Sequence, residues 1–117
     1  MSNYCYVTPI LPGGEEMMKN WIRDEIINNA DHDRVFGMAG ISREQVWIQR
    51  TPMGDFAVVS FEVEDPGKAF RVLGSSTDPW AAKFRNFLMR AHGVDVTQPL
   101  PLNEQVGDWH VMEKIRM

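Results

Sequence analysis

The sequence has only one cysteine among its 117 residues, and this scarcity excludes two kinds of stabilisation. A single cysteine cannot form a disulfide within the chain, and it cannot build a cysteine-based zinc site. Cys5 lies between Tyr4 and Tyr6 in a stretch rich in strand-forming residues. We therefore expect Cys5 to be a small buried apolar residue rather than a reactive thiol.

Long apolar runs and an excess of positive charge are also missing. No run approaches the roughly 20 apolar residues that a membrane-spanning helix requires, so we expect no membrane partner. The start of the chain lacks the basic and apolar regions of a secretion signal, which predicts a cytoplasmic location. Twelve basic residues against sixteen acidic ones give a net charge of −4, which argues against a nucleic-acid partner.

Histidines are few and widely separated, which argues against a metal site. His32, His92 and His110 show no metal-ligand spacing, and we expect no metal and no cofactor. A haem would need one axial histidine facing a cavity, a role for which His92 or His32 could be nominated. The structural alternatives are a helix-ending residue for His92 and a solvated helix position for His32.

The length and composition that remain are those of one globular domain spanning residues 1–117. Residues 3–10 read as a strand that ends at a Pro-Gly-Gly breaker. From Glu15 onward Met18, Ile22 and Ile26 recur every four residues, which predicts an amphipathic helix. Residues 28–33 are poor helix formers, so we expect a kink or break there before a stop at Gly40.

Two further strands are predicted over residues 45–51 and 56–63, joined by a three-residue hairpin loop, Pro52-Met53-Gly54. If Thr51 faces Asp55, Trp47 pairs with Val59 on one face, and Ile48 pairs with Val58 on the other. Both faces of the sheet then carry large apolar groups. Helices on one side only would leave the second face wet, which predicts a protein partner.

The second half of the chain contains two helix starts of the same kind. Asp65-Pro66 and Asp78-Pro79 each resemble an N-cap followed by proline at the first helical position, and His92-Gly93 ends the second helix. Residues 94–103 predict an extended crossing, and residues 106–115 a last strand. The predicted fold is α+β and ferredoxin-like, β-α-β-β-α-β with a split second helix and an antiparallel sheet.

The stretch from Ile41 to Val59, with Asp65-Pro66 and His92-Gly93-Val94-Asp95, resembles an uncharacterised group of small bacterial proteins in the dimeric α/β-barrel superfamily. The resemblance covers most of residues 5–100. It implies ferredoxin-like protomers whose sheets pack face to face in a dimer. The superfamily includes antibiotic-biosynthesis monooxygenases without cofactors, stress-responsive A/B barrel proteins and haem-handling enzymes. Its members share no single active site, so no catalytic residue is carried over.

Six residues are candidates for ligand binding. Trp47, Gln49, Arg50 and Asp55 gather at one end of the hairpin, where Trp47 and Gln49 would face a pocket between sheet and helices. The structural alternative makes Trp47 a core residue, pairs Arg50 with Asp55 or another carboxylate, and gives Asp55 a role in the turn. An aromatic cavity could be lined by Tyr4, Tyr6, Trp47, Trp80 and Trp109, with core packing as the structural alternative. Trp80 joins the candidates on this ground, and His92 joins them as a polar group.

These observations favour a homodimer that binds a small, aromatic or apolar organic molecule. The first alternative is an enzyme of the cofactor-free monooxygenase or isomerase kind, with Trp47, Gln49, Arg50 and His92 as the groups to test. The second is a structural or regulatory dimer without a ligand.

Overall fold

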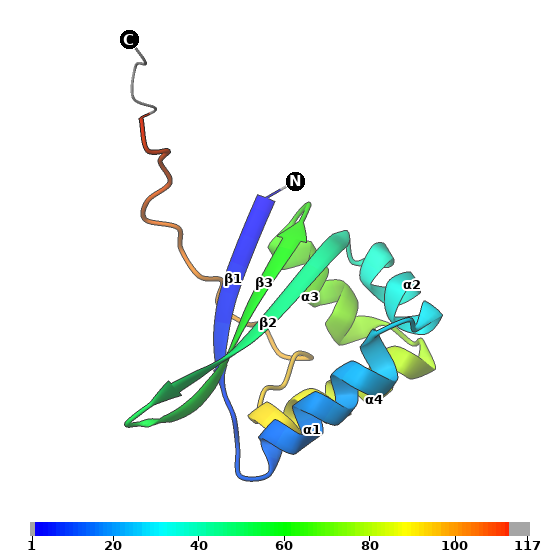
Figure 1. Cartoon of the computed structure of the whole chain (residues 1–117). Helices are drawn as coiled ribbons and strands as arrows, with labels where there is room; N and C mark the ends of the chain where they lie inside the picture. Colours follow the sequence, from blue (N-terminus) through cyan, green and yellow to red (C-terminus); the bar gives the residue numbers. More distant parts are fainter. Residues whose placement is uncertain (1, 113–117) are drawn as a thin grey trace.

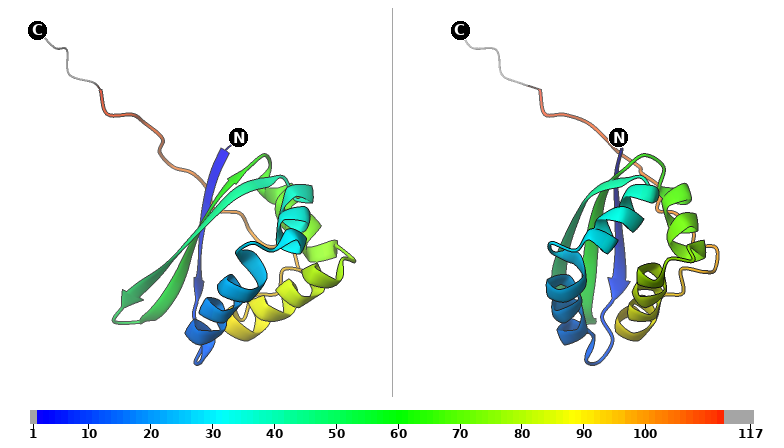
Figure 2. Two further views of the ribbon diagram at one scale, coloured as in Figure 1. Left: turned by 45° about the vertical axis from the view of Figure 1, so that its right-hand side comes forward. Right: turned by 90° about the vertical axis from the view of Figure 1, so that its right-hand side faces the viewer.

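The computed structural model describes residues 2–112 and shows an α+β fold with helices on one face of a sheet (Figures 1 and 2). The strands β1, β3 and β2 are antiparallel and lie in that order, so that β3 is central. The elements in chain order are β1 (Ser2–Pro9), α1 (Gly14–Trp21), the π-helical turn η1 (Ile22–Ile26), α2 (Ala30–Met38), β2 (Ile41–Thr51), β3 (Gly54–Val63), α3 (Pro66–Ser75) and α4 (Pro79–His92).

The split of the second helical region into α3 and α4 is confirmed, and each helix begins at its predicted cap. The Asp65 carboxylate accepts a hydrogen bond from the backbone N–H of Lys68, and Asp78 accepts one from Trp80. These bonds satisfy backbone donors that a helix leaves free in its first turn. Gly93 ends α4 with a φ of 69°, a left-handed conformation that glycine adopts without steric cost.

The first helical region is broken, as its sequence predicts, although the break is shorter than expected. The α1 helix passes into η1, and the chain then leaves helical geometry at Ile27. The Asn29 side chain accepts hydrogen bonds from the N–H groups of Asp31 and His32, so residues 30–33 begin α2. A π-helical turn is rare and is frequently found at functional sites.

The predicted hairpin register is wrong by one residue. Thr51 pairs with Gly54 rather than with Asp55, so the loop consists of Pro52 and Met53 alone. The cause is the Thr51 hydroxyl, which donates to the carbonyl oxygen of Gly54 at 2.7 Å and accepts from the N–H of Met53 at 3.1 Å. A shift of one residue reassigns the partners of every β2 side chain.

The corrected register places Trp47 opposite Val58, and Ile48 opposite Ala57. Ile48 therefore points toward the helices, while Trp47 points away from them. The prediction that Ile48 and Val58 share a face is wrong for the same reason. Val58 does lie on the uncovered face, as predicted.

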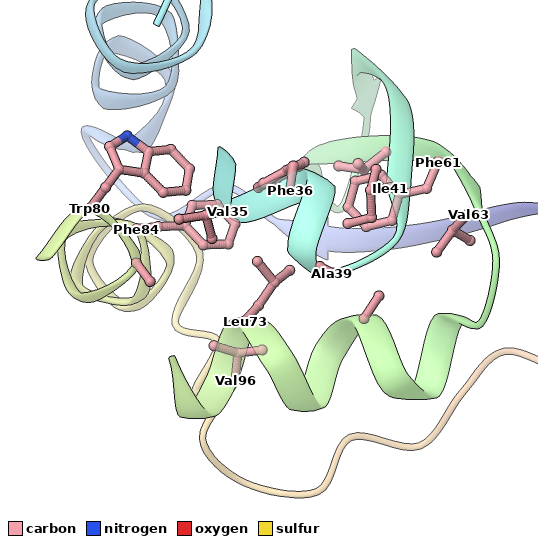
Figure 3. Packing of buried hydrophobic residues seen from close by; sticks show 13 residues of the cluster. Val35, Phe36, Ala39, Ile41, Phe61, Val63, Leu73, Trp80, Phe84 and Val96 are labelled. Carbon is pink, nitrogen blue, oxygen red and sulfur yellow. The ribbon is translucent and has the colours of Figure 1, made fainter. Parts of the chain in front are cut away.

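The main core lies between β3 and the helices and combines aliphatic with aromatic side chains (Figure 3). Phe61, 1% exposed, packs edge-on against Phe36 of α2 at a centroid distance of 6.0 Å. Trp80 and Phe84 of α4 stack on each other at 5.4 Å. Burying each such side chain contributes about 1.5–3 kcal/mol.

The face of the sheet that points away from the helices is called the open face below. Its centre is the apolar row formed by Val7, Val58 and Trp47, one residue from each strand. Val7 is 53% exposed and Trp47 is 51% exposed. Cys5 also lies on this face and is exposed, so the expectation of a buried Cys5 is wrong. The other residues on the open face are Asn3, Pro9, Arg43, Gln45, Gln49, Phe56, Ser60 and Glu62.

After α4 the chain crosses α3 and reaches the edge of β1, which confirms the predicted extended crossing. The backbone at Val96 contacts Gly74 of α3, and Asn103 bonds to Tyr4 and Cys5 of β1. The strand predicted over residues 106–115 is wrong over its described part, because residues 106–112 pair with none of the described strands. Residues 113–115 lie outside the described range. Among residues 2–112, no helix is long and apolar enough to cross a membrane.

Candidate functional site

A small apolar cavity lies between the sheet and the first and last helical elements. Its volume is about 40 Å³, room for two or three water molecules at about 15 Å³ each. The walls come from strands β1, β2 and β3, helices α1 and α4, and the turn η1. The lining residues are Tyr6, Thr8, Met18, Trp21, Ile22, Ile26, Glu44, Val46, Ala57, Val59, Phe84, Phe87, Leu88 and His92.

One wall residue, Trp21, carries a buried hydrogen-bond donor without a partner. The indole stacks on Phe87 with ring centroids 4.8 Å apart and planes tilted by only 5°. Its Nε1–H is enclosed and makes no hydrogen bond. Leaving such a donor unpaired costs about 1–3 kcal/mol, so an acceptor brought into the cavity would gain from meeting it.

His92 brings a neutral imidazole to the same cavity. Its side chain is 6% exposed, and Nδ1 lies 2.8 Å from the carbonyl oxygen of Pro9. A carbonyl only accepts, so Nδ1 carries the proton and Nε2 keeps the lone pair. Burial lowers the pKa of His92, and the hydrogen bond to Pro9 only partly opposes that effect. The predicted role of His92 as the last residue of α4 is confirmed.

We expect the ring of His92 to titrate below 6.5, its ordinary value. Because the folded-state pKa is lower than the unfolded one, the stability that neutral His92 contributes is complete above about pH 6.5. It is lost as the pH falls through the lowered pKa. An NMR titration of the imidazole C–H signals, assigned with His92→Gln, measures the midpoint. A midpoint at or above 6.5 would contradict the burial of the ring.

Two further polar groups line the cavity, Tyr6 of β1 and Glu44 of β2, from the strands on either side of β3. Burial and the nearby carboxylate of Glu44 raise the pKa of the Tyr6 phenol well above its usual range. The phenol therefore stays protonated and keeps a donor. The cavity thus combines apolar walls with a few fixed polar atoms, the composition typical of small-molecule sites.

Glu44 also lines a second, surface hollow of about 190 Å³. Within that hollow, His32 Nε2 lies 3.8 Å from Glu44 Oε1, and His32 Nδ1 lies 2.9 Å from Asp33 Oδ1. Burial lowers the pKa of His32, but the two carboxylates outweigh it and raise the pKa overall. His32 is therefore half-enclosed beside two acids rather than solvated, as the structural alternative had it.

No family model, curated protein or solved structure matches this chain. The resemblance to the dimeric α/β-barrel superfamily therefore stays a prediction. Within residues 2–112, no group of three or more histidine, cysteine or acidic side chains is placed to hold a metal ion.

Of the six predicted candidates, only His92 lines the cavity. Trp47 and Gln49 lie on the open face, so the prediction that they face a pocket between sheet and helices is wrong. The physical reason is the alternation of β2, in which the intervening residues Val46 and Ile48 take the helix-facing positions. Trp80 is a core residue, 3% exposed, and stacks on Phe84 behind the cavity wall.

Arg50 and Asp55 form a surface ion-pair cluster with Glu15 of α1. The Arg50 guanidinium lies 2.7 Å from Asp55 Oδ2 and also contacts the Glu15 carboxylate. Hydrogen bonds from Arg50 and Lys19 lower the pKa of Glu15 to about 2. Arg50 thus pairs with Asp55, as the structural alternative predicted, and the cluster ties the hairpin to α1. These side chains are exposed or partly exposed, so salt and water screen the attraction.

The cavity residues that the sequence did not predict include Trp21, Thr8 and Glu44, whereas Tyr6 was among the aromatic residues considered for a cavity wall. A signal was present for the strand residues. Tyr6 and Thr8 share a face of β1 by their spacing of two, and Glu44 is a lone carboxylate in register with apolar Val46. What the sequence does not show is that these faces meet α1 and η1.

Proposed function

We propose that this protein is a homodimer with a ferredoxin-like protomer, and that each copy binds a small aromatic or apolar molecule between sheet and helices. The observation that carries the binding proposal is the buried, unpaired Nε1–H of Trp21 at a cavity with mostly apolar walls. A ligand with one acceptor atom would bury its apolar part against the aromatic walls and give the indole its missing partner.

Two observations support the ferredoxin-like dimer. The strand order β1-β3-β2 is that of a ferredoxin-like sheet without the fourth strand, which would lie beside β1. The apolar row of Val7, Val58 and Trp47 exposes apolar side chains on the open face, and such a patch favours burial against a partner. Two copies packed face to face through this row would bury it on both sides of a twofold axis.

Binding requires the cavity to enlarge. A cavity of about 150 Å³ holds one benzene ring, whereas this one measures about 40 Å³. The wall that we expect to deform most easily is formed by Met18, Ile22 and Ile26, which come from α1 and η1. Methionine adapts its shape readily, and the π-helical turn lacks the regular bonding of an α-helix. We propose that η1 moves outward when the ligand enters.

Two probes of similar size test the proposal. Acetophenone carries a carbonyl acceptor, and ethylbenzene is the same ring and chain without one. We expect acetophenone to bind and to shift the Trp21 indole N–H signal downfield in NMR spectra, because the indole N–H gains a hydrogen bond. Ethylbenzene should bind more weakly and leave that signal near its starting position. The indole signal of Trp47, on the opposite face, serves as an internal control.

A matched pair of substitutions locates the site. Ala57, 1% exposed, lines the cavity, so Ala57→Leu would fill it and abolish acetophenone binding. Ala82 is exposed on α4, so Ala82→Leu should leave binding unchanged. Circular dichroism verifies that both variants fold. Binding that survives Ala57→Leu, or no change at the Trp21 signal with acetophenone, would refute the cavity as the ligand site.

The two alternatives have less support. The enzyme hypothesis requires Trp47, Gln49, Arg50 and His92 in one place, and three of these lie outside the cavity lining. The hypothesis of a purely structural dimer requires a fully packed interior, and the cavity with its unpaired indole N–H argues against that.

A further inference from the structure

The last described segment carries large apolar side chains that the same copy leaves uncovered. Residues 104–112 are called the C-terminal arm. Val106, Trp109, Val111 and Met112 on this arm are 94%, 80%, 91% and 89% exposed. The radius of gyration is 16.0 Å, against about 13 Å for a compact domain of this length. The arm accordingly projects from the domain, as Figure 1 shows.

The arm leaves the domain at the free edge of β1. The backbone N–H of Asn103 donates to the Tyr4 hydroxyl, and its side-chain amide donates to the carbonyl oxygen of Cys5, both at 2.8 Å. The next residues, Glu104 and Gln105, share a hollow with side chains of the open face, namely Asn3, Cys5 and Ser60. The arm therefore starts on the side of the sheet that the helices leave uncovered.

Pairing with β1 of the same copy would cover only a small part of the arm. An antiparallel continuation from Cys5 runs back toward Ser2, where β1 begins, and passes only three more residues. Those three residues span about 10 Å, whereas nine extended arm residues span about 30 Å. Most of the arm would run past the end of its own sheet. Figure 1 shows it passing the N-terminal end of β1.

We propose that the C-terminal arm of each copy packs across the open face of a second copy of this chain. Trp109 and Val111 are two residues apart, so they share one side of an extended segment and would contact the open face of the partner beside its apolar row, which the facing sheet covers. The proposal rests on the homodimer proposed above. It adds that the interface is exchanged between copies. A twofold pair covers both unpartnered apolar surfaces of the chain at once, because each copy supplies one of each.

Sedimentation of three proteins at micromolar concentrations tests the exchange. They are the full chain, the chain ended after Asn103, and the full-length double variant Trp109→Ser/Val111→Ser. We expect both altered proteins to dimerise at least about 100-fold more weakly, since each loses buried apolar area from two arms. Their monomers should fold normally, because the arm is exposed in the single copy. The control Asp108→Ser/His110→Ser alters the other side of the arm and should dimerise like the full chain.

Each outcome decides a separate point. Equal dissociation constants for the full and shortened chains would overturn the arm exchange and leave the homodimer standing. A monomeric full chain would overturn both. If the shortened chain fails to fold, the double serine variant still gives the answer, because it keeps the length of the chain. Hydrogen exchange adds a direct readout: arm amides should be protected in the dimer and unprotected in a monomeric variant.

Discussion

Replacing Val58 by aspartate is expected to convert the proposed dimer into a folded monomer. Val58 is the middle residue of the apolar row and lies on the central strand, so a carboxylate there would be buried in the proposed interface. An unpaired buried charge costs several kcal/mol, which weakens dimerisation by more than about 1000-fold. In the single copy the side chain is half-buried and faces away from the helices, so the fold should lose only about 1 kcal/mol through lower strand propensity.

The next residue along the chain provides the matched control. Val59 is 7% exposed and points into the helix-covered core, so Val59→Asp should destabilise the fold by about 4 kcal/mol or more. Native mass spectrometry and thermal melting separate the two effects. We expect Val58→Asp to lower the mass of the particle to that of one chain while the protein still melts as a folded domain. Val59→Asp should instead lower the melting temperature. A Val58→Asp protein that remains a dimer would show that the open face is not the interface.

The helix boundaries could be predicted because each depends on a few neighbouring residues. Asp65 and Asp78 cap their helices through bonds to N–H groups two or three positions away, and Gly93 ends α4 through its own backbone angles. Such signals are complete within a short window of sequence.

The hairpin register failed because a side chain decides it. The pattern Pro52-Met53-Gly54 fits loops of two or three residues equally well. The hydrogen bonds of Thr51 across the turn select the shorter loop. That single residue of difference reassigned the faces of Trp47 and Ile48 and, with them, most of the predicted binding rim.

The cavity could not be predicted because it depends on how separate segments of the chain, among them β1, β2 and α4, pack together. Tyr6, Glu44 and His92 are separated by tens of residues, and each alone fits a purely structural position on its strand or helix. Trp21 falls within the amphipathic helix predicted from Glu15 onward, and it is the last residue of α1. Nothing local indicates that its indole N–H would be enclosed without an acceptor, since this follows from packing against Phe87 and the sheet.

The path of the chain from α4 to β1 depends on Gly74, and a second helical glycine provides a comparison. Gly74 lies in α3, where a Cβ would overlap the carbonyl oxygen of Val96. A backbone atom cannot move aside as a flexible side chain does, so α3 and the crossing would separate. Gly37 also lies inside a helix, α2, but a Cβ there would meet open space.

We therefore expect two identical changes to have opposite effects on the free energy of unfolding. Gly74→Ala should lower it by about 1–3 kcal/mol through overpacking, whereas Gly37→Ala should raise it by about 0.5–1 kcal/mol through helix propensity. Urea unfolding of both variants measures the difference. Because the crossing sets Asn103 against Tyr4 and Cys5, Gly74→Ala should also release the start of the arm and weaken dimerisation, while Gly37→Ala should not. Equal stability of the two variants would show that the contact between Gly74 and Val96 does not constrain the path of the chain to β1.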